Sequence, residues 1–203
     1  IVNKSKYNMI KNKEIISKKQ LAIALSSIKG FKEQKVSLEQ YFTPSEIAAD
    51  WLWNAYLQGD IKEKVIVDFG CGTGILGLGA LILGAKKVYL VDKSQEAIKI
   101  AKNNLLTINR EYKELSLKEK CEIKCIGIEN FNKEVDTVLQ NPPFGTKQKH
   151  SDRNFLIKAF EIGDIVYSMH KISTKKFVKA ISADYNFNIT HRWEYQFPIK
   201  AVH

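Results

Sequence analysis

The sequence predicts an α/β fold of the doubly wound type, in which helices cover both faces of a mostly parallel sheet. Apolar runs suited to buried strands alternate with helical segments from residue 64 to residue 197. A glycine-rich stretch, VIVDFGCGTG, joins the first of these strands to the helix that follows it. The 203 residues, 44% of them hydrophobic, suffice for one compact domain with a short appendage.

Two helices are expected ahead of the first strand. Residues 16–31 form the first, with Ser17 able to cap its start and Gly30 placed where a C-terminal glycine belongs. The second covers residues 43–59, and its expected boundary residues are Thr43 as the cap, Pro44 in the first turn, Glu46 as the capping-box partner and Gly59 at the end.

From residue 64 onward, strands and helices alternate. Runs of β-branched and aromatic residues predict the strands, and longer segments with one apolar face predict the helices. The expected strands cover residues 64–69, 86–92, 121–128, 135–140, 164–170 and 186–197. The expected helices cover residues 75–84, 94–108, 152–163 and 173–185, with Ser94 capping the second of them. The typical order of such a sheet, 3-2-1-4-5, makes the first and fourth strands neighbours.

Positive charge is concentrated near the N-terminus. The net charge is +10, and nine Lys with two Glu give residues 1–36 a charge of +7. We therefore expect a basic helical extension over residues 1–36 and a domain over residues 37–203. The extension favours an anionic partner such as nucleic acid. A solvated lysine-rich face without a partner explains the charge equally well.

Cysteine content and hydropathy favour a protein of the reducing cytosol, with no membrane segment. Cys71, Cys121 and Cys125 are too few for a disulfide framework, and no secretory signal is visible. Cys121 and Cys125 lack a second ligand pair, so no metal site is expected and a strand is the better interpretation. No run of 18 apolar residues predicts a transmembrane helix.

The glycine-rich stretch has the spacing D-x-G-x-G-x-G, from Asp68 through Gly70, Gly72 and Gly74. The dinucleotide fingerprint would need a glycine where the chain has Ile75. A carboxylate just before the loop also suits a cationic ligand better than a pyrophosphate. The spacing resembles the S-adenosylmethionine (SAM) loop of class I methyltransferases. That resemblance implies that the glycines let the methionine part of SAM approach the backbone.

A second carboxylate, Asp92, ends the following strand at the same edge of the predicted sheet. In that position it can accept hydrogen bonds from both hydroxyls of a ribose. An ordinary strand–turn–helix corner is the competing interpretation. The three-glycine spacing together with Asp92 makes it the weaker one.

The strand over residues 135–140 runs directly into Asn141, Pro142, Pro143 and Phe144. The prolines fix φ and stiffen a loop that is expected beside the glycine loop. The pattern resembles the catalytic loop of amino methyltransferases, which act on adenine N6, cytosine N4 or glutamine N5. A strand-ending turn without chemistry is the alternative.

The chemistry of an exocyclic amine explains these residue types. The amine is a weak nucleophile because its lone pair is delocalised into the ring. Two acceptors, the Asn141 side-chain oxygen and the Pro142 carbonyl, can bind its two hydrogens and favour a more tetrahedral nitrogen. Phe144 offers a face on which a flipped base can stack. No strong general base is required, since the nitrogen can lose its proton after methyl transfer.

A third motif, LEQYFTPSEIAADWLW, precedes these elements. Gln40, Tyr41, Thr43 and Pro44 match a Q-Y-x-T-P stretch that closes over the methionine end of SAM in adenine-N6 enzymes. With NPPFGTK and VYSMHKISTKKFVKA, the chain resembles the methyltransferase-like protein 5 family over nearly its whole length. The resemblance implies a Rossmann-like class I methyltransferase fold, SAM as cofactor and formation of N6-methyladenosine in small-subunit ribosomal RNA.

Two features depart from the family pattern. The acidic residue expected near the SAM adenine after the third strand is Gly127 here, so Glu129 or the Ile128 amide is expected to replace it. The family's last strand pairs antiparallel to residues 186–197, and residues 199–203 are too few to supply it. We expect that strand to be missing and one sheet edge to be exposed.

RNA is expected to contact basic residues of the N-terminal extension and of the loop after Phe144. These residues are Lys4, Lys6, Lys11, Lys13, Lys147, Lys149 and Arg153. The family resemblance also suggests a small zinc-binding activator subunit at the edge strand over residues 121–128. Two other functions remain open, namely a protein glutamine-N5 methyltransferase and a non-catalytic RNA-binding assembly factor on the same scaffold.

Overall fold

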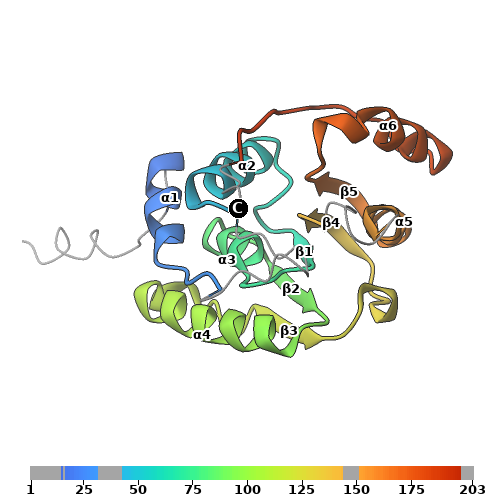
Figure 1. Ribbon diagram of the computed structural model, residues 1–203. Coiled ribbons are helices and arrows are strands. Elements are labelled where there is room, and N and C mark those ends of the chain that lie inside the picture. Colours follow the sequence, from blue (N-terminus) through green and yellow to red (C-terminus); the bar gives the residue numbers. More distant parts are fainter. Residues whose placement is uncertain (1–14, 16, 32–42, 144–150, 198–203) are drawn as a thin grey trace, which may run out of the picture.

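A five-stranded parallel sheet with the order β3-β2-β1-β4-β5 forms the centre of the computed structural model, which describes residues 15, 17–31, 43–143 and 151–197 (Figure 1). The strands are β1 (Val65–Phe69), β2 (Lys87–Asp92), β3 (Cys121–Cys125), β4 (Val135–Gln140) and β5 (Gly163–Ser168). The α-helices are α1 (Lys18–Ser26), α2 (Ser45–Leu57), α3 (Ile75–Ile82), α4 (Gln95–Glu111), α5 (Ser151–Ile162) and α6 (Lys175–Asp184). Short 3-10 helices are η3 (Lys113–Leu115), η4 (Ile128–Asn130) and η5 (Ile172–Thr174). The predicted doubly wound fold is confirmed, and β1 and β4 are neighbours as expected.

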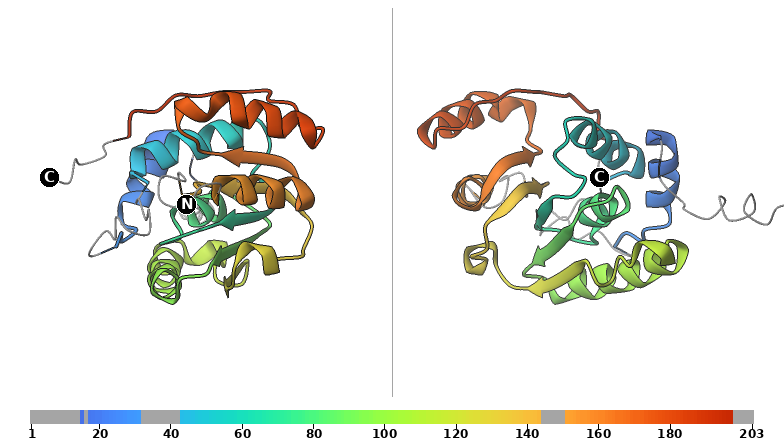
Figure 2. Two further views of the ribbon diagram at one scale, coloured as in Figure 1. Left: turned by 45° about the vertical axis from the view of Figure 1, so that its right-hand side comes forward. Right: turned by 180° about the vertical axis from the view of Figure 1, so that it is seen from behind.

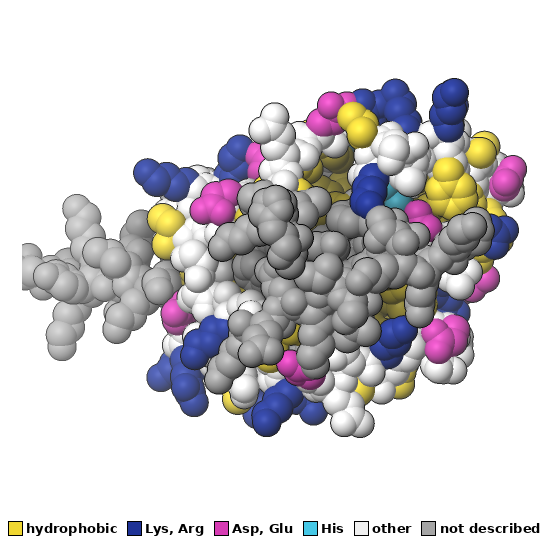
Figure 3. Space-filling model, in the orientation of Figure 1, with side chains coloured by type: hydrophobic (Ala, Val, Ile, Leu, Met, Phe, Trp, Pro, Cys, Tyr) yellow, Lys and Arg dark blue, Asp and Glu magenta, His cyan; other side chains and the backbone are white. Residues whose placement is uncertain are grey.

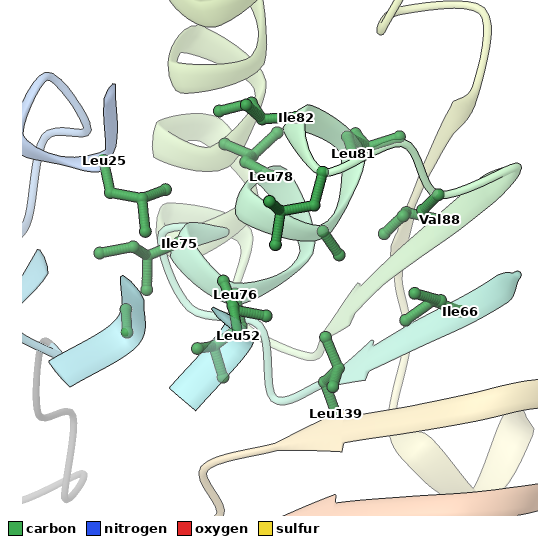
Figure 4. Close-up of a cluster of buried hydrophobic side chains, with 14 of the residues drawn as sticks. Leu25, Leu52, Ile66, Ile75, Leu76, Leu78, Leu81, Ile82, Val88 and Leu139 are labelled. Carbon is green, nitrogen blue, oxygen red and sulfur yellow. The ribbon is translucent and has the colours of Figure 1, made fainter. Parts of the chain in front are cut away.

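Each face of the sheet has its own apolar cluster, because successive side chains of a strand point to opposite faces. On one face, Ile66 and Leu139 belong to the cluster that includes residues of α1, α2, α3 and α4. Figure 4 shows this cluster around α3, whose residues are all buried. On the other face, Phe69 and Val138 pack with Phe131 and with α5. The strands are therefore covered on both sides, which explains their nearly continuous apolar runs.

Helix α1 is part of the larger of these two clusters. Its Leu21 and Leu25 are fully buried, as is Leu52 of α2. These three residues belong to the same cluster as the apolar residues of α3. Part of the expected N-terminal extension therefore shares its core with the sheet and its helices.

Serine caps begin two helices as predicted. The Ser17 hydroxyl accepts the Gln20 amide at 3.3 Å, and the Ser94 hydroxyl accepts the Ala97 amide at 3.2 Å. The expected end of α1 at Gly30 is wrong. Its C-terminal cap is Ser27, in a right-handed conformation. A serine hydroxyl in the last turn can bond to a preceding backbone carbonyl, so the helix can end here without a left-handed glycine.

The expected cap of α2 is also wrong. Its N-cap is Pro44, which offers no side-chain hydrogen bond, while Gly59 follows the helix with a φ of 82° as predicted. With the cap one residue later than expected, Glu46 is too close to the cap to complete a capping box. Its carboxylate instead accepts a hydrogen bond from the Ser45 hydroxyl at 3.1 Å. The Thr43 side chain is left for a different contact.

The expected last strand over residues 186–197 is wrong as well. This segment has no regular secondary structure and runs from α6 back toward α2 (Figure 2). The Trp193 ring stacks on Tyr167 with centroids 6.3 Å apart, and the Tyr195 hydroxyl donates to Asp50 at 2.9 Å. The segment is thus anchored through side chains, to Tyr167 of β5 and to Asp50 of α2, and it is not a strand of the sheet. Within the described residues β5 is thus a terminal strand of the sheet.

Charged side chains are spread over the surface. In Figure 3, Lys and Arg side chains lie around the rim of the face shown, with Asp and Glu between them. Among the residues that the structure describes, no helix combines the length and the apolar character needed to cross a membrane.

Candidate active site

The loop between β1 and α3 has a backbone that glycine adopts readily and other residues rarely do. Gly70, Gly72 and Gly74 have φ angles of 63°, 54° and 89°, all in the left-handed region. At Gly70, an added Cβ would also lie only 3.1 Å from the Phe155 ring. The three glycines predicted from the sequence are therefore required by the backbone. At these three positions no side chain projects toward a ligand that approaches the loop.

Asp68 lies beneath this loop at the end of β1. Its side chain is almost fully buried, and Oδ2 accepts the Gly77 amide in the first turn of α3 at 2.9 Å. Burial raises the pKa of Asp68 to about 7, despite the opposing effect of that hydrogen bond. The carboxyl group lines the same small cavity as the glycine loop. A cationic ligand there would favour its ionised form.

Asp92 joins the end of β2 to the loop. Its Oδ2 accepts the Gly72 amide at 2.9 Å, and its Oδ1 accepts the Ser94 amide at 2.8 Å. Each carboxylate oxygen has a further lone pair, so two more acceptor positions remain. Asp92 therefore lies beside the glycine loop, as the sequence predicts, and it also fixes the position of that loop.

Asn141 follows β4 at the same edge of the sheet. Its Nδ2 donates to the hydroxyl oxygen of Thr43 at 3.1 Å. Its Oδ1 is buried and has no hydrogen-bond partner among the described residues. Both residues line the cavity bordered by Asp68 and the glycine loop. The structure thus brings together residues of three motifs that are far apart in the sequence.

Phe31 is a cavity residue that the sequence patterns did not indicate. Its ring lies 3.8 Å from the position that a Cβ on Gly72 would occupy. Asn104 of α4, which is 2% exposed, holds this part of the chain in place. Its side chain accepts the Lys29 amide and donates to the carbonyls of Lys29 and Thr73, all within 3.0 Å. An amphipathic helix pattern gives no sign that one buried amide connects two distant segments.

The end of β3 differs from the prediction. The strand ends at Cys125, paired with Asp92 of β2, and not at residue 128. Gly127 is the N-cap of η4, which contains Ile128 and Glu129. The Ile128 side chain packs against the apolar cluster on the α5 face, while Glu129 is exposed. Both candidates for the adenine-binding position therefore follow the carboxyl end of β3.

A partly buried polar chain lies next to Asn141 and was also not predicted. Gln140 Nε2 donates to the Ser168 hydroxyl at 2.9 Å, and that hydroxyl is 2.7 Å from His170 Nε2. Because the hydroxyl accepts from Gln140, we assign it as the donor to His170. Burial lowers the pKa of His170 to about 4, which is consistent with a neutral ring that accepts at Nε2.

The structure places some of the other predicted site residues. Pro142 is buried, Pro143 is partly buried, and Arg153 is exposed on α5. The remaining predicted residues lie outside the described part of the chain: Gln40, Tyr41, Phe144, Lys147, Lys149, Lys4, Lys6, Lys11 and Lys13.

The residues present fit S-adenosylmethionine. The glycine loop provides an open backbone, Asp68 a buried carboxyl suited to a cation, and Asp92 the acceptors suited to a ribose. Asn141, whose Oδ1 is a buried acceptor without a partner among the described residues, lines the same cavity. The fold and this set of groups define a class I methyltransferase that uses S-adenosylmethionine.

Comparisons with known proteins agree with that class. The Methyltransferase small domain family matches residues 46–161. An rRNA N(6)-adenosine-methyltransferase, METTL5 of Danio rerio, is 33% identical over 90% of this chain and 88% of its own length. An uncharacterised protein of Methanocaldococcus jannaschii is 38% identical over 93% of this chain and 87% of its own. A crystal structure of a Pyrococcus horikoshii protein, provisionally assigned as an RNA methyltransferase, is 47% identical to this chain and matches it with a TM-score of 0.78. The match covers 86% of this chain and 84% of the Pyrococcus horikoshii chain.

The extent of these matches identifies the family. Besides the Danio rerio protein, the Mettl5 enzyme of Drosophila melanogaster is 34% identical over 76% of this chain and 73% of its own length. The chain belongs to the METTL5 family of methyltransferases.

Proposed function

We propose that this protein methylates the exocyclic N6 amine of adenine in RNA, with small-subunit ribosomal RNA as the target. The observation that carries the proposal is the Asn141 side chain, whose buried Oδ1 lacks a partner among the described residues. Asn141 borders the cavity lined by the glycine loop. The names of the METTL5 relatives, which are rRNA N(6)-adenosine-methyltransferases, support adenine in ribosomal RNA.

The proposed chemistry uses two acceptors on the catalytic loop. Asn141 Oδ1 and the Pro142 carbonyl accept the two hydrogens of the amine, which favours a tetrahedral nitrogen with an available lone pair. Phe144 stacks on the flipped base and holds it in place. Bound S-adenosylmethionine supplies an electrophilic methyl group. The proton leaves the nitrogen after transfer, so neither Asn141 nor its neighbours act as a base.

The proposed cofactor contacts are divided among three segments. Gln40, Tyr41 and Thr43 close over the methionine end, and the loop glycines Gly70, Gly72 and Gly74 admit it to the backbone. Asp68 balances its positive charge. Asp92 accepts the ribose hydroxyls with its remaining lone pairs, and Ile128 or its neighbour Glu129 binds the adenine.

Asn141→Ala tests the proposal. Loss of one preorganised hydrogen bond at a reacting centre costs about 10²–10³ in rate. Methyl transfer to ribosomal RNA should therefore fall by that factor while the calorimetric affinity for S-adenosylmethionine stays near that of the wild type. Asp92→Ala should weaken S-adenosylmethionine binding first.

Asn109→Ala is the matched control for Asn141→Ala. The Asn109 side chain also makes one hydrogen bond, from the Lys118 amide to its Oδ1 at 3.0 Å, but it lies on the exposed part of α4. The Asn109→Ala variant should therefore have the turnover of the wild type. Normal turnover in Asn141→Ala would mean that the NPPF segment is only a strand-ending turn and has no catalytic role. If the protein methylates a protein glutamine and does not methylate RNA, the proposed adenine-N6 activity is wrong and the glutamine-N5 activity takes its place.

The basic residues are proposed to bind RNA phosphate. Charge neutralisation of Lys4, Lys6, Lys11 and Lys13 together should lower the slope of log affinity against log salt by about 3. The affinity for S-adenosylmethionine should not change. The control set is Lys64, Lys86, Lys118 and Lys120, which precede strands at the opposite edge of the sheet. Unchanged RNA affinity, or an equal loss in both sets, would remove the N-terminal residues from RNA recognition. Neither outcome would bear on Lys147, Lys149 and Arg153, which these variants leave unchanged.

A small zinc-binding activator subunit is proposed to add a strand to β3. This strand is at the end of the sheet and pairs only with β2 among the described elements. Ile123→Pro should abolish co-purification of such a subunit while circular dichroism shows an intact fold. Full activity of the isolated, soluble chain would remove the reason for a partner.

A further inference from the structure

We propose that Thr43 is a positioning residue that holds the Asn141 amide in the one orientation in which Oδ1 can accept a hydrogen bond from the target amine. The inference rests on the proposed function, since it concerns how the acceptor for that amine is prepared. It gives Thr43 a role in the reaction that is separate from binding the cofactor.

The first observation is the direct contact between the two side chains. Asn141 Nδ2 and Thr43 Oγ1 are 3.1 Å apart, although the residues are 98 positions apart in sequence. Thr43 is 4% exposed. Its side chain is free for this contact because the N-cap of α2 is Pro44, without a side-chain cap hydrogen bond. A threonine in a capping position in the sequence is therefore used elsewhere in the fold.

The second observation is that the two ends of the same amide are in different environments. Nδ2 has the Thr43 hydroxyl oxygen as acceptor, whereas Oδ1 is buried without a partner among the described residues. Buried polar atoms without a partner are unusual in a folded protein. Of the two among the described residues, Gln140 Oε1 and Asn141 Oδ1, only the second belongs to a residue that lines the cavity, so a ligand there can complete its hydrogen bonding. The target amine brings the hydrogens that this oxygen lacks.

The orientation matters because an asparagine amide has one accepting end and one donating end. Rotation by half a turn about its last torsion would exchange them and present N–H groups to an amine that is itself a donor. That arrangement repels the substrate amine. A threonine hydroxyl can accept from Nδ2 or donate to Oδ1, and in the structure it accepts from Nδ2. That hydrogen bond holds the productive orientation before the substrate arrives, which is how preorganised groups assist a reaction.

Thr43 is well placed for this task because the start of α2 is anchored. The Ala48 amide donates to the Pro44 carbonyl at 2.9 Å, and Pro44 has a φ of −54°. Ala48 and Ala49 in the next turn are fully buried. The Thr43 backbone is therefore joined to a helix packed in the core, and its hydroxyl can serve as a fixed reference point for the loop after β4.

The test compares Thr43→Val with Thr43→Ser. Valine has the shape of threonine but no acceptor, and serine restores the acceptor. At saturating S-adenosylmethionine, Thr43→Val should lower kcat on ribosomal RNA about five- to twentyfold, with the KM for RNA within about twofold of wild type. Thr43→Ser should recover turnover to within about threefold.

Thr137→Val is the matched control. Thr137 of β4 is fully buried, and its hydroxyl donates to the Asp60 carbonyl at 2.8 Å. Its loss should lower the melting temperature with little change in kcat. An equal loss of kcat in both valine variants would mean that the Thr43 effect is structural and would overturn the proposal.

A double-mutant comparison separates positioning from every other role of Thr43. Asn141→Asp replaces the amide with a carboxylate whose two oxygens both accept, so its orientation no longer matters. Thr43→Val should therefore cost much less turnover in the Asn141→Asp background than in the wild type. The same loss in both backgrounds would refute positioning.

Side-chain amide signals provide a readout that does not depend on activity. In the wild type and in Thr43→Ser, the two Asn141 Nδ2 protons should give one sharp pair of nuclear magnetic resonance signals. In Thr43→Val the pair should broaden or shift as the amide turns. An unchanged sharp pair would overturn the proposal even if Asn141→Asp is inactive. A wild-type protein that does not methylate RNA contradicts the proposed function instead, and the signals then still report whether Thr43 orients Asn141.

Discussion

Replacing Asp68 with asparagine should make the protein more stable at neutral pH and poorer at binding S-adenosylmethionine. Burial raises the pKa of the Asp68 carboxyl from 3.8 to about 7. Between these values the native state keeps a proton that the unfolded state has released. Stability therefore falls as pH rises through this window. The side-chain amide of the Asp68→Asn variant would have nothing to titrate, and its oxygen could still accept the Gly77 amide, which lies 2.9 Å from Oδ2 in the wild type.

The magnitude follows from the width of the window. One pH unit corresponds to 1.36 kcal/mol per proton, so the window from 3.8 to about 7 corresponds to at most about 4 kcal/mol. We expect Asp68→Asn to equal the wild type near pH 4 and to exceed it by about 2–4 kcal/mol at pH 8. Urea unfolding of both proteins at half-unit pH steps measures this difference.

Binding should change in the opposite direction. A cation in the cavity favours the ionised carboxyl, so wild-type affinity for S-adenosylmethionine should weaken as pH falls below about 7. Asp68→Asn should bind about tenfold more weakly at pH 8 and show a flatter pH dependence. Calorimetry in two buffers with different ionisation enthalpies measures the proton that the wild type releases.

Asp136→Asn is the control for the Asp68 variant. Asp136 also accepts a backbone amide, that of Val65 at 2.6 Å, but it stands at the start of β4 and away from the cavity. The Asp136→Asn variant should bind S-adenosylmethionine with the affinity of the wild type. A stability difference between the wild type and Asp68→Asn that stays constant from pH 4 to pH 8 would refute the reasoning.

Two further changes test the packing and the polar chain. Gly79→Ala should lower the unfolding free energy by about 1–3 kcal/mol without changing cofactor affinity, because the added Cβ would lie 2.4 Å from Leu52 Cδ1. Calorimetric melting measures the loss of stability, and an unchanged melting temperature would show that Leu52 moves aside. His170→Asn should remove part of the loss of stability between pH 6.5 and pH 4, on the order of 1–3 kcal/mol, because the native state keeps the ring neutral while the unfolded state takes up a proton. Identical acid unfolding of His170→Asn and the wild type would contradict a neutral buried ring.

Much of the fold follows from local patterns. Five of the six predicted strands and all the predicted helices are present, because burial on two faces requires continuous apolar strands and covering helices. The exception, residues 186–197, has a strand-like composition. Composition alone does not supply a neighbouring strand, and Trp193 and Tyr195 found partners on Tyr167 and on α2 instead.

The sequence by itself determined the positions where only one residue type meets a local requirement. Gly70, Gly72 and Gly74 are such positions, because the left-handed backbone of the loop excludes most side chains. Only the tertiary structure decided which polar groups meet. From the sequence alone, the Thr43 hydroxyl could either cap α2 or bond to another side chain. In the structure it bonds to Asn141. The choice depends on where a loop 98 residues away is placed by the packing of β4 against β1, which no local pattern contains.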